Sequence, residues 1–405
     1  MGLKYTKIKG TRDILPEEYS LWRELLERAF KILRSYGYNF IVTPTFERTE
    51  LFIRSIGDTT DIVEKEMYTF TDRGGRSLTL RPEGTAPVVR AYLENPLIPP
   101  QKLAYFMNMF RAERPQKGRF REFWHLGVEF IGVRDPSADA EVVELAYRLV
   151  HEFGVKEIKL EINSIGTVED RKRYREVLLD YLRARKDELC EDCRRRMERN
   201  PLRVLDCKID GPKLLDAPLL TDYLSQASKS YFEDVLEYLR RWGVPFEVNK
   251  RLVRGLDYYT ETAFEIKSGA LGAQDSVGGG GRYDGLVEEL GGPPTPAVGF
   301  ALGFDRVLIA SGLQGYREPL DYFIAYLGDE AREKGFEVLQ ALRKRGKRAE
   351  ISHEKKSLKS QMKLADRLGA RYALIIGDEE LARDVVKVRD METGEEKFLK
   401  PSELP

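Results

Sequence analysis

The chain has 405 residues, which is enough for two or three domains that each bury a hydrophobic core. Its 67 lysines and arginines balance its 67 aspartates and glutamates, so any contact with nucleic acid must come from local basic patches. No apolar run approaches the ~20 residues that a membrane-spanning helix needs, and the N-terminus lacks a signal pattern. We therefore expect a cytoplasmic protein with no membrane partner, and the three cysteines suit such a reducing compartment.

The N-terminal region begins with a predicted helix. Pro16 suits a first helical turn, and an apolar stripe follows it until Gly37. Phe40–Val42 predicts a short strand that ends at Thr43-Pro44. Met67–Phe70 and Ser77–Leu80 flank a Gly-Gly turn and predict a hairpin.

The sequence RPEGT follows this hairpin directly. It places the carboxylate of Glu83 and the hydroxyl of Thr85 at the end of a strand, where polar groups can converge on a small ligand. The same letters also fit a helix start in which Glu83 lies near the positive end of the helix dipole. Both interpretations remain open at this point.

A second hairpin is predicted from Leu103–Arg111 and Arg121–Gly132, joined by a basic loop at residues 114–119. Because side chains alternate between the faces of a strand, one face of the return strand is apolar. That face carries Trp124, Leu126, Val128 and Phe130; the other carries Phe123, His125, Gly127 and Glu129, with Arg111 and Glu113 from the partner strand. A solvated face is one interpretation, but an aromatic ring beside charged groups and a basic loop favours a polyanion site.

The middle of the chain changes in composition. Asp135-Pro136-Ser137 caps a predicted helix that runs to Phe153, and Ile158–Asn163 alternates as a strand. Glu169–Arg199 is heavily charged and is predicted to be helical, as is Phe232–Arg241. These features predict a helical domain inserted at residues 169–249.

This insertion contains all three cysteines, as Cys190-x2-Cys193 and a separate Cys207. A zinc site would need a fourth soft or imidazole ligand nearby. The sequence has no histidine between His151 and His353. We therefore expect structural cysteines and no bound metal.

Three further stretches resemble binding elements. Leu252–Thr260 (LVRGLDYYT) leads into a strand that continues through Ile266. Gly278–Leu286 (GGGGRYDGL) allows a close backbone approach, but no Gly-Lys-Ser/Thr follows, so it is not a P-loop. Ala297–Arg306 predicts a strand that enters a helix, where Arg306 can share an anion with free backbone N–H groups.

The last part of the chain, residues 319–405, predicts a separate α/β unit. Strands at 322–326, 348–351, 372–376, 385–388 and 397–399 accompany helices at 330–344 and 358–368. This alternation predicts a largely parallel sheet with helices on both faces.

Together these stretches resemble the class II aminoacyl-tRNA synthetases, in the form of the histidyl family. The FRAER hairpin resembles motif 2, the first helix with its strand and proline resembles motif 1, and Ala297–Arg306 resembles motif 3, while RGLDYYT and GGRYDGL match two signatures of the histidyl family. The resemblance implies an α+β fold with an antiparallel-sheet catalytic domain at 1–168 and 250–316, the helical insertion at 169–249, and an anticodon-binding domain at 319–405. Motif 1 further implies a homodimer.

The resemblance also implies roles for individual residues. For ATP, the implied residues are Arg111 on the α-phosphate, Glu113 and Phe123 on adenine, and Arg306 on the γ-phosphate, with Mg²⁺ on the β- and γ-phosphates. Arg254 and Arg111 would neutralise the phosphoryl transition state. The implied histidine-binding residues are Glu83, Thr85, Arg111, His125, Glu129, Tyr258, Tyr259 and Tyr283. His125 departs from the family, which has glutamine at this position.

The implied activity is the ATP-dependent ligation of L-histidine to tRNA(His) through a histidyl-adenylate. One alternative is the synthetase-like regulatory subunit of histidine biosynthesis, and another is a glycyl or threonyl ligase of the same class. Arg111, Arg254 and Arg306, together with a complete C-terminal unit, argue against the regulatory subunit. The two histidyl signatures argue against the other ligases.

Overall fold

The computed structural model describes residues 4–57, 60–116, 118–205, 207, 209–272 and 275–404. Lys117, in the predicted basic loop, lies outside these residues. The chain forms two compact units, one of residues 1–14 and 21–314 and the other of residues 15–20 and 315–405. Within the described ranges, no helix is long and apolar enough to cross a membrane.

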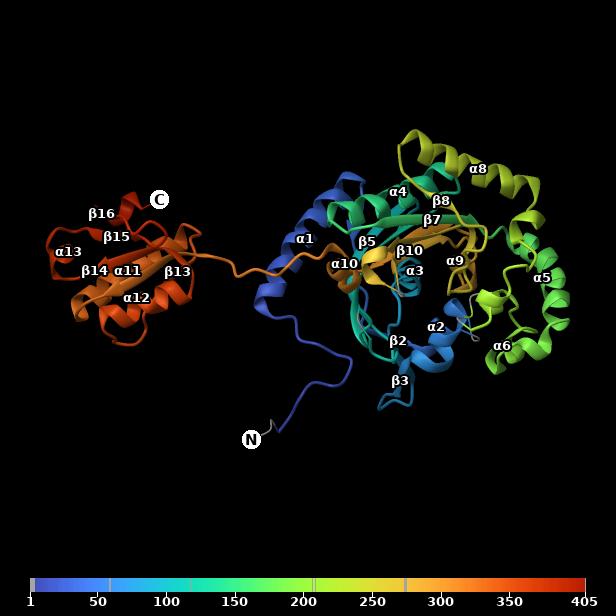
Figure 1. Ribbon diagram of the computed structural model, residues 1–405, viewed down its shortest axis with the longest axis horizontal. Coiled ribbons are helices and arrows are strands. Elements are labelled where there is room, and N and C mark those ends of the chain that lie inside the picture. The colour runs from blue at the N-terminus through green and yellow to red at the C-terminus, as the bar shows by residue number, and fades with distance from the viewer. Residues whose placement is uncertain are drawn as a thin grey trace. The chain divides into compact units, whose positions relative to one another are not determined.

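The first unit is built on an eight-stranded sheet (Figure 1). In spatial order its strands are β1 (Asn39–Phe40), β5 (Gln101–Phe110), β6 (Glu122–Ile131), β11 (Ala297–Gly303), β10 (Ser276–Arg282), β9 (Thr260–Ser268), β7 (Ile158–Ser164) and β8 (Glu247–Val248). The central pairs from β5 to β7 are all antiparallel, and only the two short edge strands pair in parallel. The antiparallel catalytic sheet predicted from the sequence is confirmed.

Helices cover one face of this sheet. They are α1 (Pro16–Ser35), α4 (Pro136–Glu152), α8 (Gln226–Arg241) and α10 (Phe304–Ser311). The apolar face of β6 packs into this core through Leu126, Val128 and Phe130, as its alternation predicts. Asp135 caps α4 by accepting a hydrogen bond from the Ser137 N–H. The opposite face of β6 is left for polar side chains.

A smaller three-stranded sheet is formed by the chain between α1 and β5. It contains β2 (Phe46–Arg48), β4 (Ser77–Leu80) and β3 (Tyr68–Thr71), and the β3–β4 pairing confirms the predicted hairpin. The helices near it are α2 (Thr49–Ile56), the π-helix η1 (Ile62–Glu66), α3 (Thr85–Glu94) and α9 (Leu286–Glu289). The start of α3 is one of the two interpretations of RPEGT, whereas the other three helices were not predicted from the sequence.

The predicted helix over 169–199 is wrong beyond Arg183. The observed elements are α5 (Val168–Arg183), η2 (Lys186–Glu188), α6 (Glu191–Arg196), α7 (Leu202–Leu205), η3 (Gly211–Lys213) and η4 (Leu220–Tyr223). Residues 183–188 contain no large apolar side chain, so a continued helix would have had no face to bury. Further along, α8 packs against α4, and β8 extends the main sheet.

The second unit is a five-stranded sheet with helices on both faces. Its elements are β12 (Leu320–Tyr326), α11 (Asp329–Lys344), β13 (Ala349–Ile351), α12 (Leu358–Arg367), β14 (Ala370–Ile376), α13 (Asp378–Ala382), β15 (Val386–Asp390), β16 (Glu396–Leu399) and η6 (Pro401–Glu403). The strand order is β13-β12-β14-β15-β16. The first three strands are parallel, but β15 and β16 are antiparallel, so the expectation of a largely parallel sheet is wrong for this edge. The chain between Ile376 and Val386 is shorter than the dozen or so residues that a parallel crossover needs.

Candidate active site

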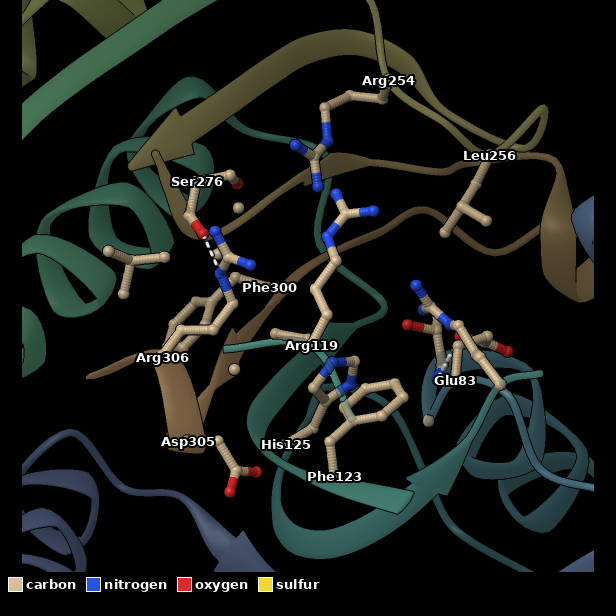
Figure 2. A pocket seen from close by; sticks show the side chains of 18 of the residues that line it. Glu83, Arg119, Phe123, His125, Arg254, Leu256, Ser276, Phe300, Asp305 and Arg306 are labelled. Atoms are coloured by element: carbon tan, nitrogen blue, oxygen red, sulfur yellow. Dashed lines mark hydrogen bonds between the residues drawn. The ribbon is translucent and has the colours of Figure 1, made fainter. Parts of the chain in front are cut away.

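One pocket gathers side chains from the RPEGT turn, from the β5–β6 hairpin, from the loop before β9 and from the ends of β10 and β11 (Figure 2). Its lining includes Glu83, Thr85, Arg111, Glu113, Arg119, Phe123, His125, Arg254, Tyr258, Tyr259 and Arg306. The structure therefore brings together nearly all of the site residues predicted from the sequence. Glu129 and Tyr283 are the two predicted residues that do not reach the pocket wall.

The β5–β6 hairpin supplies one side of this pocket. Arg111 follows β5 directly, and its Nε donates to the Pro82 carbonyl at 2.9 Å. Its guanidinium lies 5.3 Å from the centroid of the Phe123 ring. Glu113 accepts a hydrogen bond from Arg119 at 3.0 Å. The hairpin thus presents an aromatic face flanked by alternating charges.

Two more arginines line the pocket, Arg254 from the loop before β9 and Arg306 from α10. Arg254 pairs with Glu265 at 3.1 Å, and its buried Nε has no hydrogen-bond partner among the described residues. Arg306 donates through Nε to the Ser276 carbonyl, a bond drawn in Figure 2. Burial and the nearby Arg119 lower the pKa of Arg306. Four guanidinium groups thus line one pocket, an arrangement suited to a polyanion.

The glycine run forms strand β10 in the interior of the main sheet. A Cβ at Gly280 would lie 2.0 Å from the Gly299 carbonyl oxygen, and one at Gly279 would lie 2.4 Å from the Phe264 carbonyl oxygen. The Arg254 guanidinium would be only 3.0 Å from that second Cβ. Glycine is therefore required here by close packing between strands and by the approach of Arg254.

Glu83 and Thr85 begin helix α3. The Glu83 carboxylate accepts hydrogen bonds from the backbone N–H groups of Thr85 at 2.7 Å and Ala86 at 2.9 Å. The helix-start interpretation of RPEGT is confirmed, and both residues also line the pocket. Burial disfavours the charged carboxylate and so raises the pKa of Glu83.

Glu129 lies behind the pocket and is fully buried. Its carboxylate accepts hydrogen bonds from the hydroxyls of Thr85 at 2.8 Å and Tyr105 at 3.2 Å, and from Tyr283. Burial raises the pKa of Glu129 to about 8, and the three hydroxyl donors lower it only in part. Thr85 lines the pocket and therefore connects it to Glu129.

His125 stands beside Phe123 on the pocket face of β6, with ring centroids 5.1 Å apart. Its Nδ1 is buried and has no hydrogen-bond partner among the described residues. Burial, with a contribution from Arg111, lowers the pKa of His125 to about 3. The imidazole is therefore neutral at pH 7 and can offer one donor and one acceptor.

Tyr258 and Tyr259 also line the pocket. Their ring centroids lie 4.8 Å apart, and Tyr258 also makes an edge contact with Tyr283 at 5.6 Å. Arg254 lies 5.8 Å from the Tyr259 ring centroid. The three tyrosines are buried, and burial raises the pKa of each, so their hydroxyls remain protonated hydrogen-bonding groups at neutral pH.

The fold and this pocket agree with a match to a family model described as histidyl-tRNA synthetase, which covers residues 10–307. A second model, described as anticodon binding domain, covers residues 321–405. This chain belongs to the histidyl-tRNA synthetase family.

Relatives of the same family match over almost the full chain. A histidine–tRNA ligase from a Geobacillus species is 50% identical over 400 residues, covering 96% of this chain and 95% of the relative. The histidine–tRNA ligase of Pelotomaculum thermopropionicum is 51% identical over 404 residues, covering 98% and 95%. The crystal structure of apo Staphylococcus aureus histidyl-tRNA synthetase aligns with a TM-score of 0.84 and 39% identity, over 98% of both chains.

A Bacillus halodurans structure bears on the alternative interpretation. It is described as an ATP phosphoribosyltransferase regulatory subunit/histidyl-tRNA synthetase, and it aligns with a TM-score of 0.67 and 23% identity over 93% of this chain and 99% of that one. At this identity it supports the shared fold alone. The ligases at about 50% identity place the chain in the histidyl-tRNA synthetase family more specifically.

Some residues of this histidyl-tRNA synthetase pocket were not identified from the sequence. Asp305 accepts hydrogen bonds from Arg12 at 2.5 Å and from the Trp124 N–H at 3.0 Å, and so ties the start of α10 to β6. Glu265 holds Arg254 and also accepts from the Ser276 hydroxyl at 2.7 Å. The strand TETAFEIKS also carries Glu261 and Lys267, so no sequence signal distinguishes Glu265 from them.

Proposed function

We propose that this chain ligates L-histidine to tRNA(His) in an ATP-dependent reaction through a histidyl-adenylate. The observation that carries the proposal is the convergence of two groups in one pocket. The first group is four arginines with Phe123, and the second is Glu83, Thr85, His125 and the paired tyrosines. A nucleotide bound by the first group and an amino acid bound by the second would meet at the arginines. The curated relatives named histidine–tRNA ligase support the same activity.

For ATP, we propose that adenine stacks on Phe123 and that its amino group meets Glu113. Arg111 lies beside the Phe123 ring and is positioned for the α-phosphate. Arg306 approaches from α10, where burial favours pairing of its charge with the γ-phosphate. Arg119 is a further pocket arginine that can neutralise the triphosphate.

The first chemical step is attack by the histidine carboxylate on the α-phosphorus, with pyrophosphate leaving. The carboxylate is already ionised at pH 7, so this step needs no general base. Catalysis then depends on alignment and on neutralising the charge of the phosphoryl transition state. Arg111 and Arg254 would provide that neutralisation, and Glu265 would hold Arg254 in position.

For histidine, we propose that Glu83 and Thr85 bind the α-amino group, with His125 beside them. The substrate imidazole would lie among Tyr258, Tyr259 and Tyr283, and Glu129 would accept from its N–H. Because three hydroxyls already donate to Glu129, the substrate must share or replace one of these hydrogen bonds.

Mg²⁺ is expected with the β- and γ-phosphates in this family, but the described pocket carboxylates do not form a ready site for it. Glu83 accepts from α3 N–H groups, Glu113 pairs with Arg119, and Asp305 pairs with Arg12. Mg²⁺ commonly takes most of its ligands from phosphate and water.

We also propose a homodimer and a tRNA contact through the second unit. Phe40 and Val42, at the β1 edge of the main sheet, are 43% and 80% exposed. Apolar side chains on an unpaired edge favour burial against another chain. The anticodon-binding match at residues 321–405 supports a role for that unit in tRNA selection.

The deciding experiment is ATP–pyrophosphate exchange with each amino acid in turn, followed by charging of tRNA(His). We expect exchange that depends on histidine and transfer of histidine to tRNA(His). A folded protein that binds histidine but supports neither reaction would instead indicate the regulatory-subunit function. Light scattering in solution tests the homodimer separately.

A further inference from the structure

The three cysteines converge with Asp210 at a place separate from the active-site pocket. One ligand atom from each of Cys190, Cys193, Cys207 and Asp210 lies within 4.8 Å of the other three. The Cys190 and Cys207 sulfurs are 4.0 Å apart. The sequence offers no fourth sulfur or imidazole ligand, and the structure supplies a carboxylate in its place.

The four residues form two matching halves. Cys190 and Cys193 are three residues apart at the start of α6, and Cys207 and Asp210 are three residues apart before η3. The Cys193 backbone N–H donates to the Cys190 sulfur, and the Ile209 and Asp210 backbone N–H groups donate to the Cys207 sulfur. The two halves thus bring their ligand atoms around one point, with backbone N–H groups directed at two of the sulfurs.

Asp210 is the most informative member of the cluster. Its side chain has no exposed surface, yet it faces three sulfurs instead of a buried arginine. It accepts from the Cys190 N–H at 2.8 Å and from the Lys213 ammonium at 3.3 Å. A buried carboxylate is costly unless it is paired or coordinates a metal, and one lysine that is 55% exposed offsets this cost only in part.

We propose that Cys190, Cys193, Cys207 and Asp210 bind one Zn²⁺ ion as a structural site. A tetrahedral ion with Zn–S bonds of about 2.3 Å places its sulfurs roughly 3.8 Å apart, close to the 4.0 Å observed. A disulfide would require a sulfur separation of about 2.05 Å. Four protein ligands leave no open position for a substrate, so the site is structural and not catalytic. Thiolate ligands also favour zinc over the oxygen-preferring Mg²⁺.

The surrounding segment explains why a cross-link is useful there. Between Arg183 and Leu220 the described chain forms only helical pieces of three to six residues. Such short pieces are marginal unless something else holds them together. The metal would join the start of this segment to its far end.

The same segment supports the loop that carries Arg254. Arg203 pairs with Asp257 at 2.8 Å, and Asn200 donates to the same carboxylate at 3.0 Å. Both residues lie between Cys193 and Cys207, and Asp257 is three residues after Arg254. Zinc would therefore position the Arg254 loop indirectly, through Arg203 and Asn200.

Metal analysis of the full-length protein, purified without chelators, tests the site directly. We expect about one zinc per chain. Loss of a hydrogen-bond partner of a metal ligand weakens metal binding about 10–100-fold. Asp210→Asn changes a ligand itself, so it should weaken zinc binding by more than this. Asp216→Asn is the matched control, because Asp216 lies in the same segment but contacts Tyr181 and Arg185 instead. It should keep the full zinc content.

A second measurement does not depend on variants that fold poorly. Wild-type protein stripped of metal and titrated with Co²⁺ should show thiolate-to-cobalt charge transfer and tetrahedral ligand-field bands, and Zn²⁺ should abolish both. Removing zinc should also lower the melting temperature and the kcat of pyrophosphate exchange, and Zn²⁺ but not Mg²⁺ should restore them.

Three results would overturn the proposal. The first is an active protein that contains almost no zinc. The second is a cobalt spectrum without thiolate bands. The third is a Cys190–Cys207 disulfide, detected in the active protein by non-reducing mass spectrometry. The metal content and the cobalt spectrum do not depend on the aminoacylation activity. Their failure can therefore be told apart from failure of the proposed function.

Discussion

The nucleotide side and the amino-acid side of the pocket differ in how far water reaches their charged groups. Arg111 and Arg254 keep 21% and 18% of their side-chain surface exposed. Glu129 has none exposed, and Glu83 has 4%. A strongly hydrated polyanion can exchange water for accessible guanidinium groups at modest cost. The substrate imidazole must instead be selected by polar groups that lost their water when the protein folded. A wrong ligand leaves these buried groups without a hydrogen-bond partner, and this lowers its affinity.

Removing a charge from the nucleotide side should have the largest effect. Arg254→Ala should lower the rate of adenylate formation about 10³-fold, or roughly 4 kcal/mol, because the transition state loses a preorganised positive charge. Rapid-quench measurement of adenylate formation in a single turnover gives this rate. Arg251→Ala, in the same loop, is the control, since Arg251 hydrogen-bonds to the Leu214 and Leu215 carbonyls and does not line the pocket. A near-normal rate in Arg254→Ala would remove Arg254 from the mechanism.

On the amino-acid side, Glu129→Gln should raise the histidine KM and barely change the ATP KM. The substitution preserves shape but adds an amide donor, so the substrate imidazole N–H loses its acceptor at a cost of about 1–3 kcal/mol. Steady-state exchange with each substrate varied in turn separates the two KM values. If only the ATP KM moves, Glu129 belongs to the nucleotide side and the comparison above is wrong.

The buried Glu129 should also make stability depend on pH. Its pKa is raised from 4.5 to about 8, so between these values the folded protein binds more protons than the unfolded chain. The unfolding free energy should therefore fall as pH rises through this window, by up to about 1.4 kcal/mol per pH unit. Calorimetry of wild type and Glu129→Gln from pH 5 to pH 9 isolates this contribution. Parallel melting-temperature curves for the two proteins would contradict the raised pKa.

The smallest effect is expected at the aromatic wall. Phe123→Leu keeps an apolar side chain but removes the stacking surface, so the ATP KM should rise by the equivalent of about 1 kcal/mol while the histidine KM stays constant. Steady-state pyrophosphate exchange, with ATP and histidine varied in turn, measures the two KM values. A larger shift for histidine than for ATP would show that Phe123 contacts the amino acid.

The sequence allowed much of the fold to be predicted, because it depends on local periodicity. The alternation in β6 separates Leu126 and Val128 from His125 and Glu129, and the structure places these sets on opposite faces. The end of helix α5 at Arg183 was not predicted. The charged residues around it have good helical propensity, so the sequence does not show where the apolar face of the helix ends.

The arrangements that the sequence did not predict are contacts between residues far apart in the chain. Glu129 takes its donors from Thr85, Tyr105 and Tyr283, which come from three separate elements. The carboxylate of Asp210 joins the cysteines only because an irregular segment folds back on itself. Neither arrangement has a period or a short motif that sequence inspection could detect.

The glycine strand β10 has a consequence for how this gene can vary. Gly278, Gly279 and Gly280 each lie where an added Cβ would come within about 2.5 Å of a neighbouring carbonyl oxygen. Every single-base missense change of a glycine codon introduces a residue with a Cβ atom. A saturation-mutagenesis map should therefore show almost no tolerated allele at these positions, while synonymous codons stay neutral.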